Sequence, residues 1–303
     1  MRKIIDKTNN SKCRDPLIIK HNGKFYHCFT EDQKTVSVAC ADSVEEFQNA
    51  KAKVVFVPEE NKEYSKEIWA PELHIIDGKC YIYVACDNGQ NCNHKMFVLS
   101  NDSSDPMKAE YKMLGKITDD TNRWAIDGTV LTHKDKMYFV WSGWEEEVNI
   151  CQHLYIAEMS DPVTISSERV MISSPEYPWE KLGSEGVINS PYINEGPFAV
   201  YNGDDTYITY SASASWCEDY CIAAIKLVGE DLLNKNSWQK QPLPLLSSNE
   251  SLKGAGHCSV LEENGKYKVY FHAWDKAEEN ITWNTVSLWE GELKFSEGEL
   301  LIK

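Results

Sequence analysis

Residues 129–143 read TVLTHKDKMYFVWSG, in which an apolar stretch, a polar turn and a stretch rich in aromatic and β-branched residues follow one another. This pattern predicts two antiparallel strands joined by a tight turn. It recurs at four other places, which are LIIKHNGKFYHCFT (17–30), LHIIDGKCYIYVAC (73–86), FAVYNGDDTYITYSA (198–212) and SVLEENGKYKVYFHA (259–273). The sequence therefore predicts five β-hairpins.

The hairpins are far enough apart to belong to larger repeated units. Their turns centre on Gly23, Gly78, Asp135, Gly203 and Gly265, at intervals of 55, 57, 68 and 62 residues. A third alternating stretch follows each of them, at 35–43, 94–106, 153–162, 219–227 and 281–289. Five antiparallel sheets of about four strands, arranged radially, form a five-bladed β-propeller. We therefore expect an all-β fold in which residues 1–303 make a single propeller domain.

A propeller of the WD type does not fit this sequence. Its repeat is about 40 to 45 residues long, and Trp-Asp occurs here only at Trp274-Asp275. Helix signals are few. Ser43 and Glu46 have the spacing of a capping box, which is compatible with one short helix and equally with a solvated turn.

The charge of the chain limits its partners. With 31 Lys and Arg against 47 Asp and Glu in 303 residues, the net charge is −16. Nucleic acids and anionic membranes are bound through clustered basic residues, so neither is an expected partner.

The first residues bear on location. Asp6 follows Met1–Ile5 at once, without the apolar core of a secretory signal. We therefore expect a cytoplasmic protein, or a secreted one if a leader has been trimmed.

The ten cysteines are expected to be reduced thiols, as in a cytoplasmic protein of this size. Cys86, Cys92 and His94 lie close together in the sequence, and Cys217 lies four residues before Cys221. Neither group has the paired C-x-x-C spacing of a zinc site.

A polar cluster is expected just before the first strand of every hairpin. The clusters are Arg14-Asp15-Pro16, Trp69-Ala70-Pro71-Glu72, Ile126-Asp127-Gly128, Asn194-Glu195-Gly196-Pro197 and Gly256-His257-Cys258. Asp15, Asp127, Glu195 and His257 each lie eight residues before the centre of the next turn. Because equivalent positions of the repeats lie on one ring, three carboxylates and a histidine are expected to converge near the propeller axis.

Turn formation is the simpler explanation for a lone Asp-Gly pair. It does not explain an acid at the same offset in blade after blade. Carboxylates that converge raise one another's pKa, because like charges disfavour ionisation. This effect separates a proton donor from a base, which glycoside hydrolysis requires.

These motifs resemble those of glycoside hydrolase family 43, and they stand in the same order. The likeness extends from about residue 13 to residue 274 and includes Trp124–Thr129 and Gly254–His257. The stretch YIAEMSDP…ISSPEYPWEK…NEGP…ITYSASASW…YC is similar to the α-L-arabinofuranosidase members. The resemblance implies a five-bladed propeller that inverts the anomeric centre and uses no organic cofactor. It also implies Asp15 as general base, Glu195 as general acid and Asp127 as the residue that tunes and orients the acid.

Two features depart from the family pattern. The last cluster reads Gly-Ala-Gly-His where Gly-Pro-Gly-His is commoner, which we expect to change a loop and not the chemistry. The arginines are Arg2, Arg14, Arg123 and Arg169, so none falls in the last two predicted blades. Several β-xylosidases of the family have an arginine there at the sugar site. Its absence favours arabinofuranosides as substrates.

Tryptophans supply the other candidate site residues. Trp69, Trp124, Trp144, Trp216 and Trp274 lie beside the acidic clusters or beyond second strands, where rings can form a platform for a sugar face. Burial in the core is the alternative for each of them. We expect Trp69 and Trp144 to bind substrate.

His257 is also expected at the substrate site, with a further role in holding Ca²⁺ or another cation near the axis through water. A hydrogen-bonded core histidine is the alternative.

The sequence thus predicts an inverting, exo-acting glycosidase that releases terminal α-L-arabinofuranosyl residues from arabino-oligosaccharides or arabinan-derived fragments. A β-xylosidase or an endo-arabinanase would need only different walls around the same acids. A non-catalytic sugar-binding propeller is a weaker alternative, because all three carboxylates are present.

Overall fold

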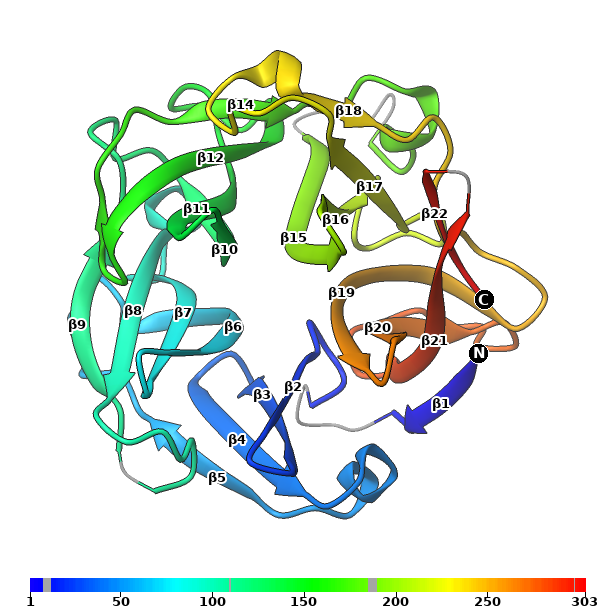
Figure 1. Ribbon diagram of the computed structural model, residues 1–303. Helices are drawn as coiled ribbons and strands as arrows, with labels where there is room; N and C mark the ends of the chain where they lie inside the picture. The colour runs from blue at the N-terminus through cyan, green and yellow to red at the C-terminus, as the bar shows by residue number, and fades with distance from the viewer. Residues whose placement is uncertain (8–11, 109, 185–189, 297) are drawn as a thin grey trace.

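Five antiparallel hairpins form the inner part of the protein in its computed structural model, as the sequence predicts (Figure 1). The structure describes residues 1–7, 12–108, 110–184, 190–296 and 298–303. The hairpins are β2 (Leu17–His21) with β3 (Lys24–Glu31), β6 (Lys66–Ile76) with β7 (Lys79–Asp87), β10 (Ala125–His133) with β11 (Lys136–Gly143), β15 (Tyr192–Asn202) with β16 (Asp205–Ala212), and β19 (Leu252–Glu263) with β20 (Lys266–Asp275).

Further strands extend each hairpin outward into a blade. The third strands are β4 (Thr35–Ala41), β8 (Lys95–Asn101), β12 (Cys151–Asp161), β17 (Cys221–Leu227) and β21 (Ser287–Ser296). The fourth strands are β5 (Ala52–Phe56), β9 (Lys112–Ile117), β14 (Val170–Ser173), β18 (Trp238–Lys240) and, in the last blade, β1 (Arg2–Ile5). Two short strands, β13 (Thr164–Ile165) and β22 (Glu299–Ile302), pair with β12 and β21. The protein is a five-bladed β-propeller, whose blades are numbered here from β2 onward (Figure 1).

Among the described residues, four short 3-10 helices connect strands. They are η1 (Val44–Gln48), η2 (Asn91–Asn93), η3 (Pro178–Glu180) and η4 (Lys235–Ser237). The capping-box spacing thus precedes a short helix, although Ser43 makes no side-chain cap hydrogen bond. Within the described ranges, no helix has the length and apolar character needed to cross a membrane.

Five apolar clusters fill the spaces between neighbouring blades. Along β7, Ile82 and Val84 belong to the cluster shared with blade one, whereas Tyr83 and Ala85 belong to the cluster shared with blade three. Because both faces of the blade are covered, the strand reads as a continuous apolar run, without the alternation of a one-sided sheet.

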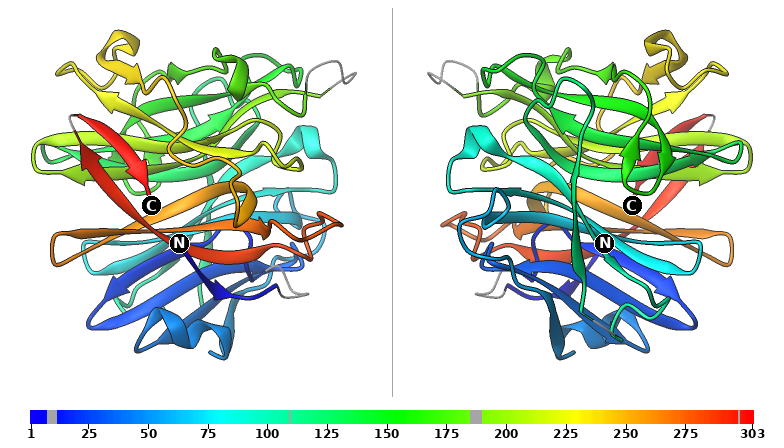
Figure 2. Two further views of the ribbon diagram at one scale, coloured as in Figure 1. Left: turned by 90° about the vertical axis from the view of Figure 1, so that its right-hand side faces the viewer. Right: turned by 90° about the vertical axis from the view of Figure 1, so that its left-hand side faces the viewer.

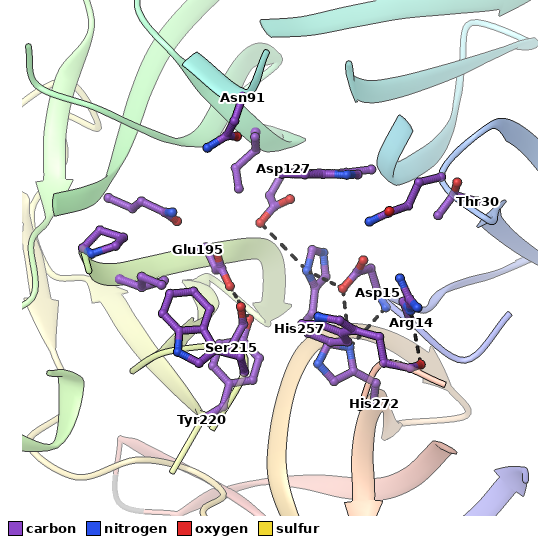
Figure 3. Close-up of a pocket in the computed structure, with 18 of the residues that line it drawn as sticks. Arg14, Asp15, Thr30, Asn91, Asp127, Glu195, Ser215, Tyr220, His257 and His272 are labelled. Carbon is purple, nitrogen blue, oxygen red and sulfur yellow. Dashed lines mark hydrogen bonds and ion pairs between the residues drawn. The ribbon is translucent and has the colours of Figure 1, made fainter. Parts of the chain in front are cut away.

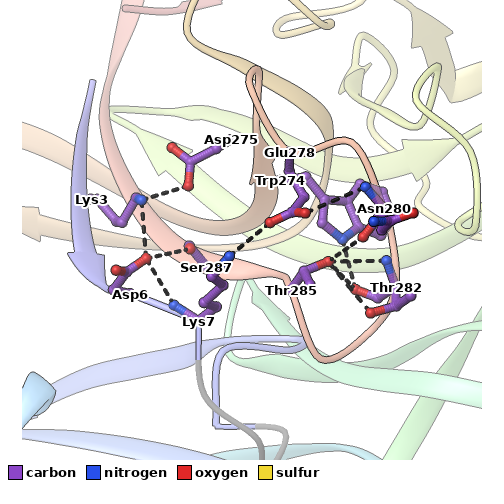
Figure 4. Close-up of polar contacts among 10 residues, drawn as sticks. All are labelled: Lys3, Asp6, Lys7, Trp274, Asp275, Glu278, Asn280, Thr282, Thr285 and Ser287. Atoms are coloured by element: carbon purple, nitrogen blue, oxygen red, sulfur yellow. Dashed lines mark hydrogen bonds and ion pairs between the residues drawn. The ribbon is translucent and has the colours of Figure 1, made fainter.

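Strand β1 closes the ring by pairing antiparallel with β21 in blade five. Arg2 makes two hydrogen bonds to Glu290, from Nε to Oε1 at 3.1 Å and from Nη2 to Oε2 at 3.0 Å. Lys3 Nζ contacts Asp275 at 2.6 Å (Figure 4). The two ends of the chain therefore meet in one blade, where both views of Figure 2 place the termini next to each other. Arg2 consequently belongs to blade five, contrary to the expectation that this blade has no arginine.

The third stretch predicted at 281–289 is wrong in its first part, because β21 begins only at Ser287. The preceding residues form a turn around a threonine hydroxyl (Figure 4). The Thr282 amide donates to Thr285 Oγ1 at 3.0 Å, and this hydroxyl lies 3.0 Å from the carbonyl oxygen of Asn280. Trp274 Nε1 donates to the Thr282 carbonyl at 2.8 Å. These side-chain bonds compete with strand pairing.

We expect Ile5→Ala to lower the free energy of unfolding by about 2 to 5 kcal/mol, because the removed atoms leave a cavity in a packed cluster. Ile5 is fully buried in the cluster shared by blades five and one. Urea denaturation measures the loss. Val148→Ala, at a site that is 64% exposed, should change stability by no more than about 0.5 kcal/mol. Equally small losses in both variants would mean that β1 does not fasten the ring in solution.

Candidate active site

The acidic clusters interrupt the inner strands, whereas the sequence analysis places them before the strands. Asp127, Glu195 and His257 lie within β10, β15 and β19, where shifts of register mark β-bulges, and only Asp15 precedes its strand, β2. A bulge redirects a side chain that regular pairing would point at the neighbouring blade. The four side chains thereby come together in Figure 3.

Three of these residues have left-handed backbone conformations. The φ angles are 44° at Asp15, 56° at Asp127 and 47° at His257. Asp and His adopt this conformation more readily than most residues. Ala70 holds the equivalent place in blade two, with φ of 43° and eight residues before the turn at Gly78. Blade two therefore contributes no charged side chain at this position.

The Asp127-Gly128 pair is part of β10 and does not form a turn. A Cβ atom on Gly128 would lie 2.2 Å from the ring of Phe139. Glycine is required here because the β11 side chain packs directly against the backbone of the bulge.

Asp15 is the most strongly acidic of the three carboxyl groups. Its Oδ1 lies 3.2 Å from His257 Nδ1 and 3.4 Å from His272 Nδ1, and its amide donates to His272 Nδ1 at 3.2 Å. Burial by itself would raise the pKa of Asp15, but the charge of His257 and the contact with His272 lower the pKa to about 2. Asp15 is therefore a carboxylate at any physiological pH.

Asp127 approaches His257 from a different side than Asp15 and Glu195 in Figure 3. Its Oδ2 accepts a hydrogen bond from the Gly196 amide at 3.0 Å and lies 3.9 Å from His257 Nδ1. Burial raises its pKa to about 6, which the charge of His257 opposes and the charge of Asp15 reinforces.

Glu195 is the weakest acid of the three. It is 7% exposed, and its Oε1 accepts a hydrogen bond from the Tyr220 hydroxyl at 2.8 Å. Burial and then the charge of Asp127 raise the pKa of Glu195 to about 8, although Tyr220 and His257 oppose the shift. Glu195 is therefore largely protonated at neutral pH.

His257 lies between the carboxyl groups in Figure 3. Its amide donates to Ser211 Oγ at 2.6 Å. Burial would lower the pKa of the imidazole, but the charges of Asp15, Asp127 and Glu195 raise it above its ordinary value. The positive ring partly offsets the negative charge of the cluster.

One cavity of about 300 Å³ brings the four polar groups together, and it is lined by Asp15, Asp127, Glu195 and His257. Its aromatic walls are Trp69, Trp124, Trp216 and Trp283. A few convergent polar groups between aromatic walls are typical of a site for a small molecule.

Trp69 reaches the cavity, and its ring stacks on the imidazole of His94 with centroids 3.9 Å apart. His94 is fully buried, with Nδ1 3.2 Å from Asp87 Oδ2 and Nε2 3.0 Å from the Glu67 carbonyl oxygen. In the sequence, the spacing of His94 from Cys86 and Cys92 pointed only to the question of a zinc site, and no pattern marked Asp87. In the structure this pair fixes the Trp69 ring.

Trp144 is not among the residues that line the cavity. Its buried ring stacks on Trp124, with centroids 4.8 Å apart and planes 10° apart. Trp144 therefore supports the ring that faces the cavity, which differs from the direct contact expected from the sequence. Trp274 is buried in the cluster between blades five and one. Trp283, from the turn that the sequence analysis assigned to a strand, lines the cavity.

Two residues that contact the carboxyl groups were not singled out from the sequence. They are His272 in β20 and Tyr220, which directly precedes β17. His272 offers a signal in the sequence, since it is a polar residue in the apolar run VYFHAW. Tyr220 stands in the closing YC of the arabinofuranosidase-like stretch, but nothing in that pattern indicates a contact with an acid, because a buried tyrosine beside a strand is ordinary.

The residues around His257 do not fit a directly bound cation. The Nδ1 atom faces two carboxylates as an ion-pair partner. In the part of the chain that the structure describes, no group of three or more His, Cys, Asp or Glu side chains is arranged to hold a metal ion. A cation held through water stays a prediction, and no step proposed below uses one.

The protein is similar to several arabinofuranosidases. It is 30% identical over 267 residues to the extracellular exo-α-(1→5)-L-arabinofuranosidase of Streptomyces chartreusis, which covers 86% of this chain and 79% of that enzyme. It is 30% identical over 269 residues to α-L-arabinofuranosidase B of Pyricularia oryzae, which covers 86% of this chain and 54% of that protein. The crystal structure of the α-L-arabinofuranosidase from Lactobacillus brevis matches with a TM-score of 0.84 at 28% identity, over 94% of this chain and 92% of that one.

These relatives contradict the predicted cytoplasmic location. The similar enzymes of S. chartreusis and Streptomyces avermitilis are both named extracellular. The composition of the first residues was therefore not informative about location.

The family model for glycosyl hydrolases of family 43 matches residues 8–288, a range that includes all five inner strands and the four groups at the axis. The resemblance noted from the motifs is thereby confirmed. The chain belongs to glycosyl hydrolase family 43.

Proposed function

We propose that the protein is an inverting, exo-acting glycosidase that releases terminal α-L-arabinofuranosyl residues from arabino-oligosaccharides or from arabinan-derived fragments of hemicellulose. The observation that carries the proposal is the difference in pKa between two carboxyl groups that line the same cavity. The pKa of Asp15 is about 2 and that of Glu195 about 8, so at neutral pH one is a base and the other an acid. The similarity to enzymes named arabinofuranosidases supports the choice of sugar.

Glu195 is the proposed general acid. Its proton passes to the glycosidic oxygen as the bond from that oxygen to the anomeric carbon breaks, and the electron pair of the bond stays with the oxygen. The carboxylate that remains is buried, so the nearby charge of His257 helps to stabilise it.

Asp15 is the proposed general base, which takes a proton from the water that attacks the anomeric carbon. Its side chain is 22% exposed, against 6% for Asp127, so water can reach it. Asp15 and Glu195 come from blades one and four, which are not neighbours. This supports the wider separation of roughly 6.5 to 9.5 Å that inverting enzymes use to accommodate a water.

Asp127 is proposed to tune and orient the acid. Its negative charge raises the pKa of Glu195. Its Oδ2 also holds the Gly196 amide, which is the peptide next to the acid in the chain. One carboxylate therefore acts on both the charge and the position of Glu195.

The remaining assignments complete the site. Trp69 and Trp124 form the proposed sugar platform, with Trp144 behind Trp124, and His257 contacts substrate while balancing the carboxylates. The carboxyl groups supply every proton transfer, so the proposed reaction requires no organic cofactor. Because the reacting groups come from different blades, we propose that residues 1–303 act as one catalytic domain.

A panel of four substrates tests the activity and its specificity. We expect cleavage of p-nitrophenyl α-L-arabinofuranoside and of short arabino-oligosaccharides from their ends, with little action on p-nitrophenyl β-D-xyloside. Preferential cleavage of the xyloside would identify a β-xylosidase instead. Random internal cleavage of linear arabinan would identify an endo-arabinanase. Absence of all activity would favour a sugar-binding propeller.

Glu195→Gln should lower turnover of arabino-oligosaccharides by a factor of about 10² to 10⁴, the usual contribution of a general acid. The p-nitrophenyl substrate should lose less, because its leaving group needs less protonation. Steady-state kinetics on both substrates measure the difference. Glu263→Gln is the control. Glu263 is the last residue of β19, and its carboxylate pairs with Lys20. This variant should keep full activity. Equal losses on both substrates in Glu195→Gln would exclude the acid role.

Asp127→Asn should move the alkaline limb of the pH–activity profile to lower pH. The reason is that the charge of Asp127 raises the pKa of Glu195, so its removal releases the catalytic proton at a lower pH. The profile of kcat/KM measures this shift. Asp135→Asn, at the exposed turn of the same hairpin, serves as the control and should leave the limb in place. A limb that does not move in Asp127→Asn would reduce Asp127 to a positioning role.

Hydrolysis of an α-L-arabinofuranoside should release the β anomer first. Direct attack of water held by Asp15 inverts the anomeric carbon. Proton NMR during the first minutes of reaction, before mutarotation, distinguishes the two anomers. Initial appearance of the α anomer, or a glycosyl group trapped on Asp15, contradicts the proposed mechanism.

A further inference from the structure

Glu195 has a hydrogen-bond donor that the mechanism above does not use. Tyr220 donates from its hydroxyl to Glu195 Oε1 at 2.8 Å, and its side chain is 1% exposed (Figure 3). Burial and the charge of Glu195 raise the pKa of Tyr220 well above its ordinary value. The phenol therefore remains protonated and can donate throughout the working pH range of the enzyme.

Three elements hold the Tyr220 ring in place. The ring stacks on His272 of β20, with centroids 5.8 Å apart and planes 16° apart. It packs so closely on β19 that a Cβ atom at Gly256 would lie 1.8 Å from its Cε1 atom. The Ser211 hydroxyl of β16 is hydrogen-bonded to Tyr220 and accepts the His257 amide. A hydroxyl fixed from three sides defines which carboxyl oxygen it meets.

This geometry distinguishes the two oxygens of the acid. When Glu195 is protonated, one oxygen carries the proton and the other is a carbonyl oxygen that accepts hydrogen bonds. Tyr220 donates to Oε1, so the proton belongs on Oε2. After transfer, the same bond is made to a carboxylate, and hydrogen bonds to a charged group are the stronger ones.

We propose that Tyr220 is a positioning residue for the general acid, which directs the transferable proton to Oε2 of Glu195 and stabilises the carboxylate that forms during the reaction. The proposal rests on the proposed role of Glu195 as acid. It adds a residue from the segment before β17 to the groups that determine when that proton is released.

The groups that face Glu195 come from four different blades. They are Asp127 of β10, His257 of β19, Asp15 before β2 and Tyr220 before β17. Burial and the two aspartates favour the protonated acid, whereas Tyr220 and His257 favour the carboxylate. Tyr220 is the neutral member of this set. Its removal therefore changes a hydrogen bond without changing the net charge of the site.

Tyr220→Phe tests the proposal, since it removes the hydroxyl and keeps the stacked ring. The pKa of Glu195 should rise, and the alkaline limb of the kcat/KM profile should move to higher pH, opposite to the shift expected for Asp127→Asn. Turnover of arabino-oligosaccharides should fall about 10- to 100-fold, the range for one hydrogen bond to a charged group. The p-nitrophenyl substrate should lose less. A uniform loss on both substrates with an unmoved limb would show a purely structural role and overturn the proposal.

Tyr207→Phe is a matched control. Tyr207 is a buried tyrosine of the same blade whose hydroxyl also donates to a carboxylate, Asp205 Oδ2, at 3.1 Å. Asp205 lies at the turn between β15 and β16, away from the residues that line the cavity. Loss of this hydroxyl should leave the alkaline limb and the leaving-group dependence unchanged. Thermal unfolding of both variants shows whether they fold.

A direct titration separates this proposal from the proposed activity. In protein labelled with ¹³C at glutamate carboxyl carbons, Glu195→Gln identifies the Glu195 signal, and its pH titration gives the pKa without any substrate. A higher pKa of Glu195 in Tyr220→Phe than in the unaltered protein supports the proposal even if no arabinofuranoside is cleaved. An unchanged or lower pKa overturns it even if the enzyme is an active arabinofuranosidase.

Discussion

Burial of both faces of every blade is the constraint on which the rest of the structure depends. An open row of five blades would leave an apolar face exposed at each end, and closing the row into a ring covers both. The N-terminal strand β1 completes the ring by joining the last blade, so the closing contacts include the first residues of the chain. Each apolar cluster is shared by two blades, which makes every blade a support for its neighbours.

The same packing sustains the irregular backbone at the axis. A left-handed residue other than glycine costs on the order of 1 to 3 kcal/mol, and Asp15, Asp127 and His257 all have this conformation. Well-packed hairpins on either side hold these bulges in place. These bulges turn the side chains away from the space between blades, so that the side chains meet in one cavity. The carboxyl groups therefore face one cavity without any bound substrate.

The sequence predicted the features that repeat and missed those that occur once. The five hairpins and the ring of Asp15, Asp127, Glu195 and His257 follow from periodicity, since the same offset recurs. Closure by β1 does not, because a pairing between residues almost 290 positions apart leaves no local pattern. The turn before Ser287 depends on a single threonine hydroxyl in a stretch with strand-like composition. Trp144 was misplaced because composition does not distinguish a ring that faces a cavity from the ring stacked on it.

The division of roles among the carboxyl groups arises from burial together with the different charged and hydrogen-bonding neighbours of each group. Burial raises the pKa of all three, and His257 lowers each of them, but unequally. Its Nδ1 lies 3.2 Å from Asp15 and 3.9 Å from Asp127, and the pKa values of about 2 and about 6 follow that order. Glu195 instead has the charge of Asp127 and a neutral phenol as neighbours, so it retains its proton. Three similar side chains on one ring thus become a base, a modulator and an acid, because His257 and His272 lower the pKa of Asp15 whereas burial and the charge of Asp127 raise the pKa of Glu195.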